Sequence, residues 1–230
     1  MAEKESRQPD IRKIGEWVVR ERRPAGQGPH PVILLLHGWT GDENSMWVFT
    51  SRLPEDAWLI APRAVYKSPS GGYSWRDEST ISIQENITLR RWPAVEVFLS
   101  SIESLKGLLS AENFPGANLD QFSLVGFSQG GALAYTFALI NPGRVRIIAG
   151  LSTFVPEGAE TLALRVPLPE KHIFVAHGLQ DDLVPVDKAR QSAALLEQAG
   201  SIVTYCEDNV GHKLGVDCFC ALEDFFLKYW

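Results

Sequence analysis

One serine stands between two glycines where an apolar run passes directly into a helix-like pattern. In "LVGFSQGGALAY", residues 124–135, Gly126 and Gly130 flank Ser128 two residues before and two residues after it. A strand that turns at once into a helix crowds those two positions against neighbouring backbone, so glycine fits where a Cβ would collide. Such a turn holds the serine in a strained, exposed conformation at the C-terminal edge of a sheet. We therefore expect Ser128 to act as a nucleophile.

A serine hydroxyl is a weak nucleophile and needs a base within reach. Of the five histidines, only His212, in "NVGHKLG", lies downstream of the serine in a loop between the last predicted strand and the last predicted helix. His37 and His177 end predicted strands, and each is followed by glycine. We interpret these two as residues that hold neighbouring turns through hydrogen bonds, with a site role for His37 left open. His212 is the predicted base.

The acid that orients the base should lie between serine and histidine in the chain. "HGLQDDLVP" offers Asp181 and Asp182 just after a predicted strand, and the residues alone leave the choice between them open. Glu207 and Asp208 are closer to the base in sequence, but we interpret them as surface charges. The order serine, aspartate, histidine matches α/β-hydrolases and differs from the orders of the two well-known serine protease folds.

Two backbone amides should stabilise the oxyanion of such a reaction. One is expected from Gln129, directly after the nucleophile, and the other from Trp39, in the turn "HGWTGDE" that follows an early strand. Because only the backbone takes part, the indole of Trp39 is expected to shape a pocket.

The remaining sequence alternates strand and helix patterns. Short apolar runs rich in β-branched residues predict buried strands at 31–36, 58–62, 122–126, 145–152, 172–178 and 201–206. Helix patterns cover 93–111, 129–140, 187–199 and 216–229, and residues 14–23 are interpreted as an exposed antiparallel edge strand. This alternation is typical of an α/β domain with a mostly parallel sheet and helices on both faces. We expect one domain over residues 1–230, without a large cap.

Two predicted connections, residues 66–91 and 153–170, are too long for ordinary loops between a strand and a helix. Long ordered loops in compact domains tend to serve a binding site, so both are candidate pocket walls. Their aromatic side chains and a neighbour are the predicted substrate-binding residues, although core or surface positions would suit them equally: Trp75, Trp92 and Phe154.

Composition excludes several classes of partner. A net charge of -6 and an isoelectric point near 5.4 give no basic footprint for nucleic acid or an anionic membrane. The three cysteines, in the last 25 residues, lack metal-ligand spacing and suggest no disulfide framework, which favours a reducing compartment. Without an apolar signal core or spanning segment, a soluble cytoplasmic protein is expected. We expect a small-molecule ester substrate, no cofactor and no stable membrane association, and we allow for a homodimer.

The segments "LHGWTGDE", "GFSQGG", "HGLQDDLVP" and "GH", in this order and spacing, resemble the phospholipase/carboxylesterase family of α/β-hydrolases. The resemblance covers about residues 30–225, and "APR" and "GGYSW" are similar to the family's pocket segment. It implies Ser128 as nucleophile, Asp181 as acid and His212 as base, with the amides of Trp39 and Gln129 in the oxyanion hole. The tryptophan at 39 and "WRDE" at 75–78 depart from the family pattern, which bears on substrate preference.

These observations predict a cofactor-independent serine carboxylesterase for short to medium acyl chains. The same chemistry would serve a thioesterase that acts on acylated protein or an acyl carrier. The third possibility is a binding protein that has the hydrolase fold and no catalysis. Reaction of Ser128 with a fluorophosphonate would separate the first two from the third.

Overall fold

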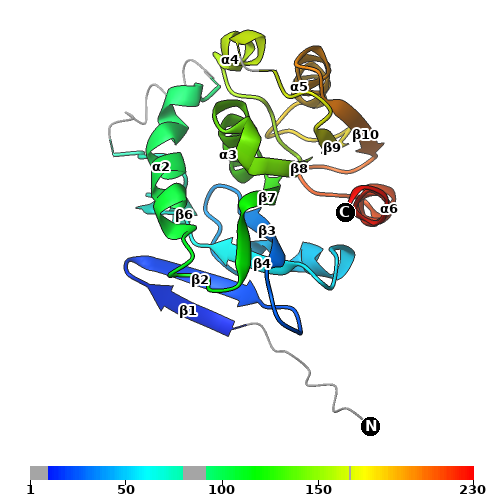
Figure 1. Cartoon of the computed structure of the whole chain (residues 1–230). Coiled ribbons are helices and arrows are strands. Elements are labelled where there is room, and N and C mark those ends of the chain that lie inside the picture. The colour runs from blue at the N-terminus through cyan, green and yellow to red at the C-terminus, as the bar shows by residue number, and fades with distance from the viewer. Residues whose placement is uncertain (1–9, 80–91, 166) are drawn as a thin grey trace.

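An eight-stranded sheet forms the centre of the molecule in the computed structural model, which describes residues 10–79, 92–165 and 167–230 (Figure 1). The spatial order is β1-β2-β4-β3-β7-β8-β9-β10. The pairings that involve β2 are antiparallel, and those from β4 to β10 are parallel. The strands are β1 (Asp10–Ile14), β2 (Trp17–Arg22), β3 (His30–Leu36), β4 (Trp58–Pro62), β7 (Ala117–Phe127), β8 (Val145–Leu151), β9 (His172–Gly178) and β10 (Ile202–Asp208).

Alternate residues of the buried strands face two separate cores. Val32, Leu34 and Leu36 of β3 belong to one cluster of buried side chains. The residues between them, Ile33 and Leu35, belong to the other. Because side chains alternate across a strand, a run that is apolar on every residue must be covered on both faces.

Helices provide that cover. The first face packs against α2 (Leu99–Leu108), α3 (Gln129–Ile140), α4 (Ala159–Arg165) and α5 (Val186–Gln198). The second packs against the 3-10 segment η1 (Ser45–Arg52) and α6 (Val216–Tyr229). Figure 1 shows α3 and α6 on opposite sides of β7 and β8. The predicted α/β architecture with helices on both faces is confirmed.

Several predicted bounds need correction. Residues 14–23 form part of a hairpin and not one strand, because Gly15 has φ 56° and turns the chain between β1 and β2. The helix predicted at 93–111 is shorter: the 3-10 segment η2 (Val95–Phe98) leads into α2. The long connection at 66–91 contains a small hairpin, β5 (Tyr66–Lys67) and β6 (Tyr73–Ser74), and its residues 80–91 lie outside the described ranges. The other long connection contains α4.

The expectation that the cysteines form no disulfide is wrong. Cys206 on β10 and Cys218 on α6 are bridged, with their Cα atoms 5.7 Å apart, and Cys220 is free and exposed. Sequence spacing could not reveal the pair, because the loop between strand and helix has to fold back before the two residues meet. The argument from cysteines for a reducing compartment therefore fails.

None of the helices in the described ranges combines the length and the apolar character that crossing a bilayer requires. The single domain and the homodimer stay predictions.

Candidate active site

Ser128 lies in the turn between β7 and α3, in an unusual backbone conformation. Its φ is 51° and its ψ is -119°, a region that residues with a Cβ rarely adopt. A Cβ on Gly126 would overlap the backbone of Gly130, and a Cβ on Gly130 would overlap the carbonyl oxygen of Leu36 at the end of β3. The Ser128 amide donates to the carbonyl of Leu151 at 2.9 Å. The two glycines thus allow the close packing of strand and helix that holds the serine in place.

Three predicted residues meet at this turn. The Ser128 hydroxyl lies 3.0 Å from Nε2 of His212, and Nδ1 of His212 lies 2.7 Å from Oδ2 of Asp181. A carboxylate can only accept, so Nδ1 of His212 carries the proton and Nε2 accepts from the serine. The structure therefore joins Ser128, His212 and Asp181 in one continuous hydrogen-bonded chain.

Asp181 is fixed by its own turn. Its Oδ1 accepts hydrogen bonds from the amides of Leu183 and Val184, at 2.9 and 2.8 Å. Nε2 of His177 donates to the carbonyl of Val184 at 2.7 Å and lies 3.3 Å from Oδ2 of Asp181. Burial lowers the pKa of His177, which keeps its imidazole neutral beside the carboxylate. The expected role of His177, to hold the turn, agrees with these contacts.

The other candidate acids lie elsewhere. Asp182 is exposed, as adjacent residues on a turn point in different directions. Glu207 accepts two hydrogen bonds from the Arg190 guanidinium, at 2.8 and 3.0 Å. Asp208 is half-buried and accepts from the amide of Cys218 at 2.9 Å, in the first turn of α6. The expectation that Asp208 is a surface charge is therefore wrong, because it ties α6 to the loop that carries His212.

The turn after β3 brings Trp39 next to the nucleophile. A Cβ on Gly38 would lie 3.3 Å from the Cβ of Ser128, so the chain passes directly beside the serine. The following residue, Thr40, has φ 64°, and its amide donates to the carbonyl of Tyr73 on β6 at 2.9 Å. Gln129, whose amide is the second expected donor, is the first residue of α3. Both predicted oxyanion residues thus adjoin Ser128.

His37 braces this turn from the inside. Its side chain is fully buried, with Nδ1 donating to the carbonyl of Gly38 at 2.7 Å and Nε2 accepting from the amide of Ala64 at 2.9 Å. Burial lowers the pKa of His37 to about 4, so the imidazole is neutral and can accept at Nε2. His37 therefore has a structural role, and its two ring nitrogens are both engaged.

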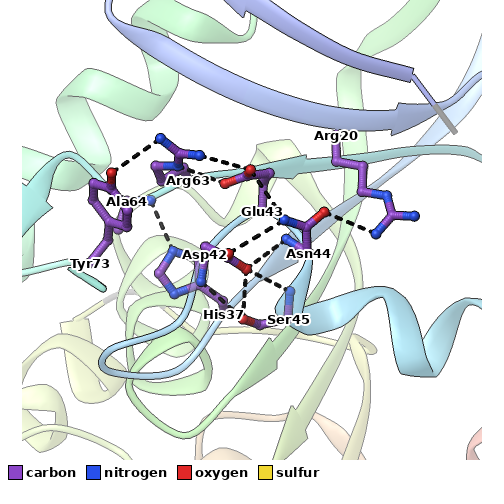
Figure 2. Close-up of polar contacts among 9 residues, drawn as sticks. All are labelled: Arg20, His37, Asp42, Glu43, Asn44, Ser45, Arg63, Ala64 and Tyr73. Atoms are coloured by element: carbon purple, nitrogen blue, oxygen red, sulfur yellow. Dashed lines mark hydrogen bonds and ion pairs between the residues drawn. The ribbon is translucent and has the colours of Figure 1, made fainter. Parts of the chain in front are cut away.

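An ion pair between buried Glu43 and half-buried Arg63 anchors the outer part of the same turn (Figure 2). The carboxylate of Glu43 accepts from Nε and Nη2 of Arg63, at 2.6 and 2.8 Å. Nη1 of Arg63 reaches the Tyr73 hydroxyl at 3.1 Å, and the guanidinium stacks on the Tyr73 ring. Burial would raise the pKa of Glu43, but the hydrogen bonds and the charge of Arg63 outweigh it and the pKa is lowered. This network links the turn to β4 and to the β5–β6 hairpin.

Trp75 does not have its predicted role in substrate binding. Its side chain is fully buried, and its Nε1 donates to the carbonyl of His37 at 2.8 Å. Its amide donates to Oε1 of Gln129 at 2.8 Å, and Nε2 of Gln129 donates to the Ser74 hydroxyl at 3.1 Å. The indole can satisfy its N–H while buried, so Trp75 packs in the core and secures the hairpin to the start of α3.

A cavity of about 420 Å³ opens at Ser128 and His212, while Asp181 lies buried behind them. The other two predicted wall residues, Trp92 and Phe154, line it and lie in contact with ring centroids 4.7 Å apart. Charged side chains at its lining come from Arg76 and Asp182. Within the described ranges, no group of three or more His, Cys, Asp or Glu side chains is arranged to hold a metal ion.

A sequence model of one family, described as Phospholipase/Carboxylesterase, matches residues 19–229. The chain belongs to the phospholipase/carboxylesterase family. Acyl-protein thioesterase 1 of Yarrowia lipolytica is 26% identical over 178 residues, 74% of this chain and 78% of that protein. Acyl-protein thioesterase 1 of Neurospora crassa is 30% identical over 201 residues, 84% of this chain and 81% of that protein. The phospholipase/carboxylesterase assignment makes the chain a hydrolase of a group that contains esterases and thioesterases.

The fold of this family member matches solved structures closely. The carboxylesterase from Mesorhizobium loti superposes with a TM-score of 0.75 at 21% identity, covering 95% of this chain and 98% of that one. At that identity the likeness supports the fold, and the predicted α/β-hydrolase fold is confirmed.

Glu43, Arg63 and Tyr73 support the turn that carries Trp39, and the sequence does not predict this role. No motif marks these residues, because charged residues near predicted turns are ordinarily solvated. Only the side-by-side placement of the turn after β3, the end of β4 and the hairpin buries the carboxylate.

Proposed function

We propose that this protein is a serine carboxylesterase that hydrolyses carboxylic esters of short to medium acyl chain. One observation carries the proposal: the hydrogen-bonded chain from Asp181 through His212 to Ser128, which ends on a serine held at positive φ. A neutral imidazole that accepts from the serine hydroxyl is the arrangement that a general base requires.

The reaction follows from that arrangement. Ser128 Oγ attacks the ester carbonyl carbon while Nε2 of His212 takes the hydroxyl proton, and the carbonyl oxygen becomes an oxyanion. When the tetrahedral intermediate collapses, the bond to the alkoxy oxygen breaks and His212 gives its proton to the leaving alcohol. Water then attacks the acyl-enzyme with His212 as base again, which releases the acid and restores Ser128.

Asp181 and two amides complete the proposed machinery. The carboxylate of Asp181 keeps the Nδ1–H tautomer of His212 and stabilises the imidazolium that forms during each step. The amides of Trp39 and Gln129 are assigned to the oxyanion. The close approach of Gly38 to Ser128 and the rigid support by His37 favour this assignment.

The proposed preference for short to medium acyl groups rests on the cavity. Its volume of about 420 Å³ lies in the ordinary range for small-molecule sites. Trp92 and Phe154 offer apolar surface, and Arg76 and Asp182 place charge beside it, which suits water-soluble esters better than a lipid surface. Strong activation by triglyceride droplets would contradict this preference.

Thioester hydrolysis is the second candidate. The observation in its favour is that both relatives above are named acyl-protein thioesterase 1. The same nucleophile and base would cleave either bond, so a panel of p-nitrophenyl esters and acyl-thioesters of increasing chain length decides between them. A consistently higher kcat/KM for the thioesters would replace the carboxylesterase assignment.

The serine mechanism itself is tested by labelling. A fluorophosphonate should modify wild-type protein at Ser128 and leave folded Ser128→Ala unmodified, since the reagent requires an activated hydroxyl. In Ser128→Ala, kcat should fall by a factor on the order of 10^6, as seen when a single triad member is removed. Folded wild-type protein that takes up no label would favour the non-catalytic binding protein.

A further inference from the structure

A second cavity, of about 500 Å³, adjoins the first along Trp39. Trp39 lines both cavities, and among the described residues it is the lining residue that they have in common. Most side chains that enclose the second cavity are apolar, although Lys213 also lines it. The apolar ones come from the turn after β3, from η1, from the end of β7, from the loop after β10 and from the start of α6, and they include Trp39, Met46, Val48, Phe127, Leu214 and Phe219.

This second cavity lies behind the residues next to the reacting groups, whereas Ser128 and His212 themselves line the first cavity. Gly38 lines it and passes beside Ser128, where a Cβ on the glycine would lie 3.3 Å from the serine Cβ. Phe127 lines it as well, and the centroid of its ring lies 5.0 Å from that of His212. Leu214 follows the base by two residues in the same loop. The cavity wall is thus made from the immediate neighbours of the nucleophile and the base.

An ester presents two groups to such a site. The acyl group becomes bonded to Ser128 in the first half-reaction and stays there until water releases it, and Ser128 itself lines the first cavity, so that cavity suits the acyl group. The alcohol must leave before water attacks, and its oxygen must lie within reach of Nε2 of His212 to receive the proton. The alcohol oxygen can lie at His212 in the first cavity while the rest of the alcohol extends past Trp39, which lines both cavities, into the second.

We propose that the second cavity binds the leaving alcohol of the ester, and that it selects alcohols with an aryl or branched alkyl group. This inference rests on the proposed esterase function. An apolar cavity of roughly 150 Å³ already holds a benzene ring, so 500 Å³ lined with Phe127, Leu214 and Phe219 accommodates such a group with room to spare. Burial of that group in the second cavity favours esters of apolar alcohols over methyl esters.

The test varies the two halves of the ester separately. One series keeps acetate and changes the alcohol from methyl to butyl to benzyl, and the other keeps ethanol and lengthens the acid from acetate to butyrate to hexanoate. Val48 is 63% exposed at the cavity, so Val48→Trp can fill the cavity without disturbing the core. We expect the ratio of kcat/KM for benzyl acetate to that for methyl acetate to fall about tenfold or more. The ranking within the acyl series should be kept.

Two control variants match this one in size and exposure. Leu183 lines the first cavity and is 70% exposed, so Leu183→Trp should change the acyl series and keep the ranking of the alcohol series. Leu164 on α4 is 87% exposed and lines neither cavity, so Leu164→Trp should leave both series as in the wild type. Should Val48→Trp fail to fold, Val48→Ser removes apolar surface at the same place, and the same ratio should fall about threefold.

The outcomes separate this inference from the proposed function. An unchanged alcohol ranking in folded Val48→Trp, or an equal loss on every ester of both series, overturns the leaving-alcohol site while esterase activity stands. Folded wild-type protein that hydrolyses no ester of either series overturns the proposed function, and the leaving-alcohol site with it.

Discussion

Acidification from pH 7 to pH 5 should destabilise the fold through His37. The pKa of the buried imidazole is about 4, against 6.5 for an exposed histidine, so the unfolded chain takes up the proton first. The stabilisation that this difference in pKa supplies is fully present above about pH 6.5 and decreases as the pH falls towards 4. Below about pH 4 no further stabilisation is lost. The two pKa values correspond to about 3 kcal/mol over the whole window and about 2 kcal/mol by pH 5.

The loss has a structural cause and a direct assay. Protonation would put a hydrogen on Nε2, which accepts from the Ala64 amide, and would bury a charge beneath the turn that carries Trp39. Urea denaturation at pH 7 and pH 5, on wild type and His37→Gln, isolates the effect, because every other titrating group is common to both. The wild type should lose about 2 kcal/mol more than the variant.

A second measurement guards against a variant that is poorly folded. The imidazole proton resonance of His37, assigned by its absence from His37→Gln, should stay unchanged between pH 7 and pH 5. Equal losses of stability in the two proteins, or a His37 resonance that titrates near pH 6.5, would refute the reasoning.

Three further predictions follow from the site. Asp181→Asn should lower kcat by a factor approaching ~10^4 through the wrong imidazole tautomer, whereas exposed Asp182→Asn should change kcat by less than about threefold; the reverse pattern in folded variants would identify the wrong acid. Gly130→Ala should lower the free energy of unfolding by about 1–3 kcal/mol in urea titrations, because its Cβ would overlap the carbonyl that ends β3. Replacing Cys206 and Cys218 together by serine should lower the free energy of unfolding by about 3 kcal/mol in the same assay, since the bridge closes a loop of 12 residues that contains His212. Unchanged stability would argue against the disulfide.

Much of the fold could be predicted from local sequence. The strands at 58–62 and 172–178 and the helices at 129–140 and 216–229 agree with the structure residue for residue. Each is a strongly apolar run or a strongly periodic segment with clear ends, where local pattern and tertiary packing favour the same conformation. The hairpin at β1 and β2 and the short helix α4 were missed, because a single glycine turn and seven helical residues leave little periodicity.

The sequence by itself determined the identities and order of Ser128, the aspartate pair and His212. The serine could be recognised because the tight turn between β7 and α3 leaves no room for a Cβ at Gly126 and Gly130. Tertiary structure decided what depends on contacts between distant segments. On the turn after β9, the side chain of Asp181 faces His212, whereas that of Asp182 is exposed. Trp75 is fully buried in the core. The turn after β3, the end of β4 and the β5–β6 hairpin are distant in sequence and meet only in the folded protein, where they form the Glu43–Arg63 ion pair. The disulfide likewise needs β10 and α6 to pack together, and the cavities need several separate loops. Local sequence therefore does not predict these features.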